Sequence, residues 1–491
     1  MQRPAYLAEH EREYLARGWW RDDDTLWHWL QRNAFRLARR PAVVAAGATL
    51  TWAELRGRVL RAAAGLKDKG VGAGDVVAVQ LPNIPEFLIL HLAIARLGAV
   101  MCTVHMPYRG AEIDLITGHS GAKLFINASY PIQDLLGHEP LHDDHPAPDA
   151  RDPFLLLYTS GTTASPKAVP HPYRSMLGNS RLGAAEHGLS AESRILCAAP
   201  FSHLYGLYSL HCAWSVGACS VLLPAFKPDD LAVLMEKERP TALWCGPAHM
   251  AGCRNAGLFD KHDWSSLELA IVSGSMAPPA LMEFLQQKLY GCAVTQLWGM
   301  TELQAALYTR PGDPQERSRM SAGRPSPGTQ IRIHEGELQV KGPLCFSGYY
   351  NNDEANRNAF TDDGWFRSGD LAEQRGQHPH AYFAITGRSK DIINRGGVKF
   401  NPAEVEVLLD AHPKILQSAI VPMPDPVLGE KACAFVTLRN PNTPAELEEL
   451  VAYLLEQRIA KNKLPERLVV IPEMPLTPTR KIIKSRLRLP E

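Results

Sequence analysis

The sequence predicts an α/β protein: a large N-terminal domain of doubly wound sheets with a small β-barrel-like subdomain, then a small, mobile α+β domain. The first reason is length, since 491 residues exceed the ~250–300 at which one hydrophobic core stops growing. The second is the alternation of short apolar segments with helical ones, which is typical of a parallel sheet covered by helices. The third is a change near residue 330 to alternating apolar and polar residues, as in half-buried antiparallel strands.

Hydrophobic spacing locates the first elements. A helix is predicted over 24–41, where apolar residues recur at helical spacing. Glu54 follows Thr51 by three residues, so we expect a capping box at the start of a helix over 53–67. Further segments predict strands at 42–45, 49–52, 76–80, 100–104 and 154–157 and a helix at 86–97.

The middle of the chain repeats this rhythm. Polar residues follow several of the predicted strands, and an open α/β sheet binds its ligand beyond the carboxyl ends of its strands. We therefore expect these polar residues to converge on one cleft. The elements predicted here are strands at 195–199, 220–223, 242–245, 269–273 and 294–298 and helices at 229–238 and 277–289.

A polar, Gly-rich segment over 387–397 marks the predicted domain boundary. We expect a large domain over 1–389, a small lid domain over 390–491 and a hinge near Lys390. The lid is expected to contain helices at 402–411 and 444–460 and strands at 416–422, 431–438 and 467–471.

Composition argues against several classes of function. Lys and Arg together number 52, as do Asp and Glu, so charge favours neither a nucleic acid nor an acidic membrane surface as a partner. The nine cysteines are an odd number without a C-x-x-C pair, which argues against a disulfide framework and favours a cytoplasmic protein. The most apolar stretch, 88–104, is interrupted by polar residues and is too short to span a bilayer.

The segment 158–167, Tyr-Thr-Ser-Gly-Thr-Thr-Ala-Ser-Pro-Lys, lies between two predicted extended segments. Its hydroxyls, backbone N–H groups and terminal ammonium are suited to phosphate oxygens. It is not a Walker A loop, because Pro166 stands where that motif needs glycine. A simple Ser/Thr-rich turn is the alternative. The residues predicted to hold nucleotide phosphates are Thr159, Ser160, Gly161, Thr162, Thr163 and Lys167.

Six motifs occur in order along the chain: YTSGTTASPK at 158–167, PFSHLYG at 200–206, WGMTE at 298–302, WFRSGDLA at 365–372, GRSKDIINRGG at 387–397 and PLTPTRKI at 475–482. With them the chain resembles the adenylate-forming superfamily of acyl-CoA synthetases, nonribosomal adenylation domains and luciferases. In character it is similar to stand-alone aryl or acyl acid ligases. The resemblance covers roughly residues 26–487, and six ordered motifs are far more specific than one.

The resemblance implies a two-step ligase that uses ATP and Mg²⁺. A carboxylate attacks the α-phosphate of ATP to give an acyl-adenylate and pyrophosphate, and a nucleophile, most often the thiol of coenzyme A, then displaces AMP. It implies that Glu302 binds Mg²⁺, Thr301 donates to the α-phosphate, and Lys481 bridges the acid and that phosphate. Asp370 would accept the ribose hydroxyls, with Arg388 nearby. The residues implied to surround the rest of the nucleotide, adenine included, are Gly274, Ser275, Trp298, Gly299 and Met300.

Each of these residues has a structural alternative. The alternative for Lys481 is one more solvated lysine in a basic tail, and the alternative for Asp370 is an Asx-turn residue. Glu302 suits the cap of a helix following Thr301, and Trp298 suits plain core.

The resemblance also implies that Gly396 and Gly397 let the pantetheine of coenzyme A pass close to the backbone, after the lid rotates about Lys390. A simple glycine turn is the alternative. Three positions depart from the family pattern: Ala164 and Ala168 replace glycines of the phosphate segment, and Arg480 replaces the glycine before Lys481. If any of these positions requires a positive φ, a side chain there costs about 1–2 kcal/mol.

An aromatic-rich group falls in segments that line the acid pocket of relatives, which favours an aryl or compact cyclic acid. Its alternative is aromatic core packing. His203 is expected to gate the pocket or to serve as a catalytic base for the acceptor. The predicted pocket residues are Phe201, His203, Tyr205, Tyr208, Trp244 and Gly246.

We therefore expect an ATP-dependent ligase that joins an aromatic or compact cyclic acid to coenzyme A. One alternative is a stand-alone amide bond synthetase with an amine acceptor, or a loader of a carrier-protein thiol, the carrier acting in trans. The other is a catalytically impaired nucleotide-binding module.

Overall fold

The computed structural model describes residues 1, 6–45, 47–159, 167–377, 381–477 and 480–489. Contacts divide the chain into two compact units: Met1–Ile331 with Val340–Phe366, and Arg332–Gln339 with Arg367–Glu491. The domain boundary at 389/390 and the hinge at Lys390 stay predictions.

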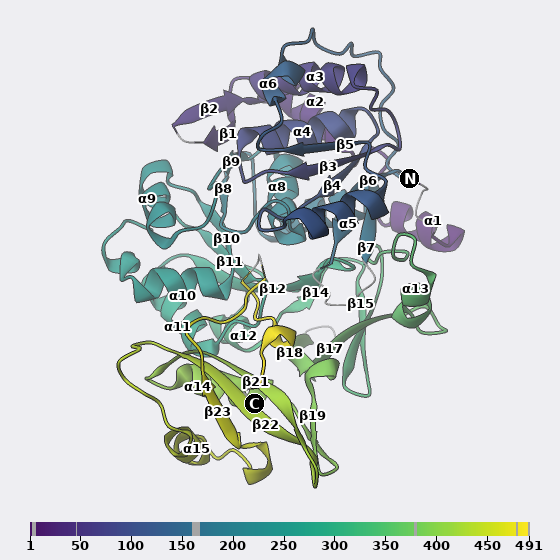
Figure 1. Cartoon of the computed structure of the whole chain (residues 1–491). Helices are drawn as coiled ribbons and strands as arrows, with labels where there is room; N and C mark the ends of the chain where they lie inside the picture. The colour runs from purple at the N-terminus through teal and green to yellow at the C-terminus, as the bar shows by residue number, and fades with distance from the viewer. Residues whose placement is uncertain (2–5, 46, 160–166, 378–380, 478–479, 490–491) are drawn as a thin grey trace. The chain divides into compact units, whose positions relative to one another are not determined.

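The larger sheet of the first unit has nine strands, and its central six are parallel, as the doubly wound prediction requires (Figure 1). Antiparallel strands close both edges. In spatial order the strands are β14 (Arg324–Pro325), β13 (Gln304–Tyr308), β12 (Ala293–Met300), β11 (Leu269–Ser273), β10 (Ala242–Cys245), β8 (Arg194–Cys197), β9 (Cys219–Val221), β1 (Pro41–Ala45) and β2 (Ala48–Thr51).

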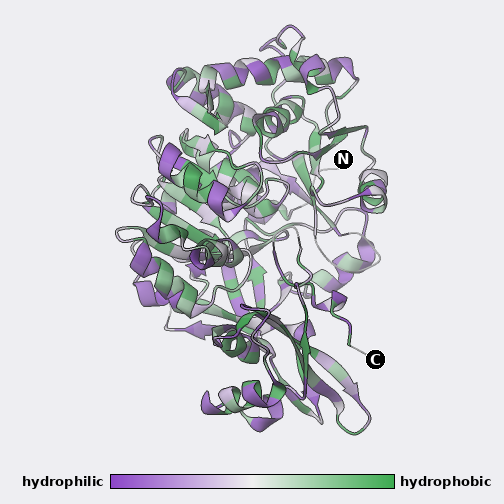
Figure 2. Ribbon diagram, turned by 60° about the vertical axis from the view of Figure 1, so that its left-hand side comes forward, coloured by the Kyte–Doolittle hydropathy of each residue, from purple (hydrophilic) through white to green (hydrophobic). Residues whose placement is uncertain are grey.

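The second sheet of this unit has five strands, of which only β7 is antiparallel to its neighbour. The strands in spatial order are β5 (Leu124–Asn127), β3 (Val76–Gln80), β4 (Val100–Thr103), β6 (Pro153–Tyr158) and β7 (Ala168–Pro172). One hydrophobic core takes residues from both sheets and from several helices, among them α4 (Pro85–Arg96), α7 (Tyr173–Glu186) and α8 (Leu204–Val216). In Figure 2 many strand segments are green, whereas outer helices carry purple as well as green.

Some helices of the first unit are set by local capping, and others by burial in the core. The predicted capping box is confirmed: the Thr51 hydroxyl accepts from the Glu54 N–H, and Glu54 accepts from the Thr51 N–H at 2.8 Å. Helices α7 and α8 were not predicted, because most side chains of α7 and nearly all of α8 are buried, so neither has a clear amphipathic stripe. The helices of this unit are α1 (Ala8–Ala16), α2 (Leu26–Arg36), α3 (Trp52–Asp68), α4 (Pro85–Arg96), α5 (Gly110–Ser120), α6 (Ile132–Leu136), α7 (Tyr173–Glu186), α8 (Leu204–Val216), α9 (Pro228–Glu238), α10 (Pro247–Asn255), α11 (Pro279–Lys288), α12 (Gln315–Met320) and α13 (Asp353–Ala359).

The second unit contains most of a four-stranded sheet in the order β15 (Gln330–His334), β16 (Glu337–Lys341), β17 (Phe366–Arg375) and β18 (Tyr382–Arg388). A further sheet has the order β20 (Val398–Phe400), β19 (Ile393–Arg395), β22 (Gly429–Leu438) and β21 (Ile415–Asp425), with β23 (Arg467–Val470) parallel to β22. Helices α14 (Ala403–Ala411) and α15 (Leu447–Glu456) contribute apolar residues to the same core as this sheet. In the described parts of the chain, a helix long and apolar enough to cross a membrane is not found.

Candidate active site

The predicted phosphate segment connects β6 to β7, which pair as an antiparallel hairpin with Tyr158 opposite Ala168. At its neck the Thr159 N–H donates to the Lys167 carbonyl at 2.9 Å. The structure therefore places the two ends of the segment beside each other. The remaining predicted members, Ser160, Gly161, Thr162 and Thr163, lie outside the described residues, as does Ala164.

Ala168 adopts ordinary strand geometry. It is buried, it does not have a positive φ, and its carbonyl accepts from the Tyr350 N–H at 2.8 Å. Replacing the family's glycine with alanine at this position therefore causes no backbone strain.

Glu302 and Lys167 meet at a residue that the sequence analysis missed, Tyr349. Its hydroxyl donates to Oε1 of Glu302 at 2.8 Å, and its ring centre lies 5.2 Å from the Lys167 Nζ. Burial, and then the neighbouring Glu302 carboxylate, raise the pKa of Tyr349, so the hydroxyl stays protonated and acts as a donor. Tyr349 follows Glu302 by 47 positions in the sequence. No local sequence pattern therefore indicated this contact.

The Glu302 carboxylate fits a magnesium ligand. It is 8% exposed, and carboxylate oxygen is the hard donor that Mg²⁺ prefers. Tyr349 donates a hydrogen bond to this carboxylate without adding a positive charge of its own.

The turn that carries Glu302 is tight. A Cβ on Gly299 would lie 1.8 Å from the Gln304 carbonyl oxygen, so only glycine fits there. The Leu303 N–H donates to the Met300 carbonyl at 3.0 Å, and strand β13 begins at Gln304. The alternative that Glu302 caps a following helix is therefore wrong, because the chain turns back into the sheet.

The residues implied to surround adenine lie at one edge of the large sheet. Strands β11 and β12 are parallel neighbours with Ser273 opposite Leu297. Gly274 and Trp298 come directly after this pair, so they lie at the same carboxyl edge. Trp298 is only half-buried, and Ser275 is exposed. Trp298 is therefore not a plain core residue.

In the second unit, Asp370 and Arg388 are cross-strand partners on β17 and β18. Arg388 Nε lies 3.2 Å from Asp370 Oδ1, and their side chains are 44% and 9% exposed. The Asp370 N–H donates to the Ser368 hydroxyl at 3.1 Å. The two residues implied to contact the ribose thus form one ion pair, which depends on strand register.

Lys481 is half-buried in a loop closed by two hydrogen bonds to Thr477. The Thr477 N–H donates to the Lys481 carbonyl at 2.8 Å, and the Lys481 N–H donates to the Thr477 hydroxyl at 3.0 Å. Arg480 has a φ of 62°, in the left-handed region. The turn therefore forms with arginine in place of the family's glycine, at a conformational cost.

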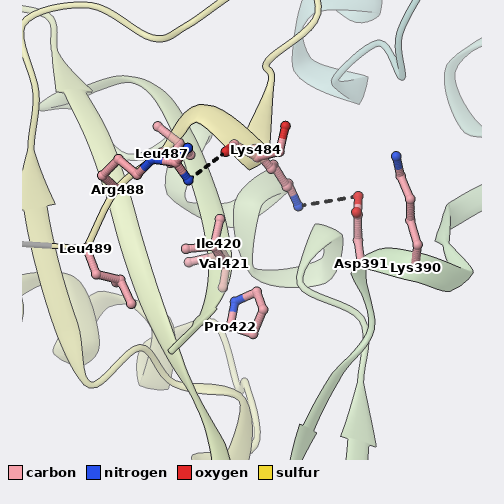
Figure 3. Close-up of a pocket in the computed structure, with 10 residues that line it drawn as sticks. Lys390, Asp391, Ile420, Val421, Pro422, Lys484, Leu487, Arg488 and Leu489 are labelled. Carbon is pink, nitrogen blue, oxygen red and sulfur yellow. Dashed lines mark hydrogen bonds and ion pairs between the residues drawn. The ribbon is translucent and has the colours of Figure 1, made fainter. Parts of the chain in front are cut away.

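The hinge candidate Lys390 lies with Asp391 on a short 3-10 turn, Ser389–Asp391, beside a cavity of about 380 Å³ (Figure 3). In Figure 3 the Lys484 side chain points toward Asp391, and Lys390 projects in another direction. Lys484 Nζ lies 2.7 Å from Glu406 Oε1 and 3.8 Å from Asp391 Oδ2. These ion pairs connect Lys484, three residues after Lys481, to Glu406 on α14 and to Asp391 beside the predicted hinge.

Gly396 and Gly397 form the turn between β19 and β20, with φ values of 59° and 87°. A Cβ added to Gly397 would meet none of the described residues' atoms within 4 Å, so this part of the turn is open. The geometry is compatible with both the simple turn and the pantetheine path.

The predicted acid-pocket residues divide into two groups. His203 is half-buried and caps α8, its Nδ1 accepting from the Tyr205 N–H at 3.2 Å. Gly246 precedes α10. The aromatic residues pack in the core of the first unit, namely Phe201, Tyr205, Tyr208 and Trp244. Their place in a pocket wall stays a prediction.

A second histidine, His105, faces His203, and the sequence analysis did not select it. Their ring centres are 6.2 Å apart with stacked planes. The His105 Nδ1 lies 2.9 Å from the Ser202 hydroxyl, and burial lowers the pKa of His105 to about 4. A neutral His105 therefore orders the segment that carries His203.

A family model described as AMP-binding enzyme matches residues 30–350, and one described as AMP-binding enzyme C-terminal domain matches residues 404–481. The chain is 30% identical to the medium-chain fatty-acid–CoA ligase of Escherichia coli (strain K12), over 97% of this chain and 92% of that protein. It is also 30% identical to the 2,3-dihydroxybenzoate-AMP ligase of Bacillus subtilis (strain 168), over 99% and 96%.

A solved structure is similar over nearly the whole fold. The o-succinylbenzoate CoA synthetase of Bacillus subtilis, in complex with its acyl-adenylate intermediate, superposes with a TM-score of 0.85 at 26% identity, covering 94% of this chain and 98% of that one. The chain therefore belongs to the adenylate-forming superfamily of AMP-binding enzymes, and it is an ATP-dependent adenylating ligase.

Proposed function

We propose that this ligase activates an aromatic or compact cyclic carboxylic acid as its acyl-adenylate and transfers the acyl group to coenzyme A. The observation that carries the adenylation step is the arrangement of Glu302 and Lys167 around Tyr349. It brings a buried carboxylate and an ammonium group together beside the predicted phosphate segment. Two of the three relatives described above act on aromatic acids by name, which supports the acid class.

Adenylation needs charge neutralisation and positioning more than covalent help. Lys167 and Thr159 would hold the phosphates, and Asp370 with Arg388 would hold the ribose. Mg²⁺ bound to Glu302 would neutralise phosphate charge. Lys481 would orient the acid carboxylate and stabilise the charge that develops on the α-phosphate.

Transfer needs a second arrangement of the lid. Lys481 and Gly397 lie on different loops of the second unit, one after β23 and one between β19 and β20. We propose that one lid orientation presents Lys481 for adenylation and another presents Gly396 and Gly397 to the pantetheine of coenzyme A, with rotation at Lys390.

A two-part screen tests the proposal. Pyrophosphate release is measured with ATP, Mg²⁺ and a panel of benzoates, cyclic acids and medium-chain fatty acids. Products formed with coenzyme A, with amines and with a phosphopantetheinylated carrier protein are then identified by mass spectrometry. We expect the highest kcat/KM for an aryl or cyclic acid and a coenzyme A thioester as the product.

Each of the other outcomes would overturn one part of the proposal: the acid class, the acceptor or the adenylation activity. Preference for fatty acids would overturn the acid class, and an amide or carrier thioester as the only product would overturn the acceptor. No pyrophosphate with any acid would favour the impaired nucleotide-binding module. His203→Ala should alter the order of preferred acids if His203 lines the pocket, whereas uniform slowing would indicate a structural histidine.

A further inference from the structure

We propose that Tyr349 positions both charged groups of the nucleotide site, holding Glu302 through its hydroxyl and Lys167 through the face of its ring. This inference rests on the proposed roles of Glu302 at Mg²⁺ and of Lys167 at the phosphates. Tyr349 itself acts through these two residues.

The hydroxyl contact is suited to orienting a carboxylate. Tyr349 and Glu302 are each 8% exposed, and their oxygens are 2.8 Å apart. A hydrogen bond to an ionised group is short and roughly twice as strong as a neutral one, and low exposure strengthens it further.

The tyrosine is itself held in place. Its N–H donates to Asn356 Oδ1 at 2.6 Å, and its carbonyl accepts from Asn356 Nδ2 at 3.1 Å. The Phe346 ring meets the Tyr349 ring edge-on at 4.8 Å, and the Phe346 N–H donates to the Glu302 carbonyl at 2.9 Å. The backbones on both sides of the contact are therefore fixed, so the hydroxyl has a defined direction.

The Tyr349 ring also contacts Lys167, at the end of the predicted phosphate segment that connects β6 to β7. The Lys167 ammonium lies 5.2 Å from the ring centre, within the range of a cation–π attraction. The next residue, Tyr350, donates its N–H to the Ala168 carbonyl, which adjoins Lys167. One rigid side chain thus holds a cation on its face and an anion at its edge.

Two substitutions separate the contacts. Tyr349→Phe removes the hydroxyl and keeps the ring, and Tyr349→Leu removes both. Calorimetry measures the affinity for a non-hydrolysable ATP analogue with and without Mg²⁺, and the Mg²⁺ requirement for pyrophosphate release is measured in parallel. Tyr350→Phe is the matched control, because it removes the same atom from the neighbouring tyrosine, whose ring packs on His119.

For Tyr349→Phe we expect unchanged affinity for the metal-free analogue and an Mg²⁺ requirement raised about tenfold. Tyr349→Leu should in addition weaken metal-free binding about two- to fivefold. Tyr350→Phe should match the wild type in both measurements. Thermal unfolding of all three variants checks that the fold is retained.

Several results would overturn the inference. A wild-type Mg²⁺ requirement in Tyr349→Phe would show that the hydroxyl does not position Glu302. Equal metal-free affinity of the Phe and Leu variants would show that the ring does not hold Lys167. Equal loss with and without Mg²⁺ in Tyr349→Phe would indicate packing alone.

Glu302→Gln separates this inference from the proposed function. If Glu302→Gln raises the Mg²⁺ requirement and Tyr349→Phe does not, only the positioning role fails. If Glu302→Gln leaves the Mg²⁺ requirement unchanged, the proposed metal role fails, and the inference fails with it.

Discussion

Glu302 in the first unit and Lys481 in the second are proposed to act on the same nucleotide, yet they are held differently. Glu302 is buried, and it is fixed by a side-chain hydrogen bond and by its backbone carbonyl. Lys481 is half-buried in a short loop closed by two hydrogen bonds with Thr477, one donated by its backbone N–H and one accepted by its hydroxyl. This difference supports our proposal that the metal side of the site is built in advance, whereas Lys481 acts in the adenylation step only.

The largest expected effect is at Lys481. Lys481→Ala should lower pyrophosphate release about 10²–10³-fold, because it removes a charge contact to the transition state. The variant should still convert supplied acyl-adenylate to product at near wild-type speed, measured in a separate transfer assay. Gly397→Trp should do the reverse, because its indole would block the pantetheine path.

This prediction has two contradicting outcomes. If Lys481→Ala adenylates normally and only the Lys481→Ala/Arg480→Ala double variant fails, the assignment to a single lysine is wrong. If Gly397→Trp leaves transfer intact, the path of coenzyme A is wrong.

The second prediction concerns Glu302, on the proposed metal side of the site. Glu302→Gln should reduce adenylation about 10²-fold at low Mg²⁺, because it removes a charge with little change of volume. The fold should be retained, as checked by thermal unfolding. Adenylation equal to the wild type at low Mg²⁺ would contradict the assignment.

The two units should also differ in their response to acid. Burial lowers the pKa values of His91, His171 and His187 to about 3 and that of His105 to about 4, all in the first unit. In the unfolded chain these groups have a pKa near ~6.5. As pH falls below that value, the unfolded state binds protons before the folded state does. The stability that these neutral histidines contribute is therefore complete above pH ~6.5 and is lost progressively down to their folded pKa values of about 3 and about 4, by up to about 1.4 kcal/mol per pH unit for each group.

Tryptophan fluorescence measures this effect, because all ten tryptophans lie in the first unit. We expect its urea midpoint to fall clearly from pH 7.5 to 5.5. His412→Gln, in the second unit, should leave the difference unchanged. A midpoint independent of pH would show that these histidines are not buried in their neutral form.

The smallest effect is expected at Arg480. Arg480→Gly relieves a left-handed conformation that costs a side chain about 1–2 kcal/mol, partly offset by about 0.5–1 kcal/mol of extra chain entropy in the unfolded state. The lid should become slightly more stable in hydrogen exchange, with adenylation changed less than about threefold. A large fall in adenylation would show instead that the arginine shares the role of Lys481.

Much of the fold follows from the sequence because it rests on local patterns. Apolar runs such as 76–80 and 269–273 form buried strands, and Thr51 with Glu54 forms the capping box. The six ordered motifs also identify the family from the sequence alone. These features depend on residues close in the chain, where periodicity and capping chemistry act directly.

Only the tertiary structure decided how distant residues combine. Most residues of α7 and nearly all of α8 are buried, so their sequences lack the stripe that marks an amphipathic helix. The Asp370–Arg388 ion pair depends on the register of β17 against β18. Tyr349 meets Glu302 and Lys167 only because packing brings three separate segments together. Sequence periodicity reports which face of an element is buried, but it carries no information about which distant side chain will lie against it.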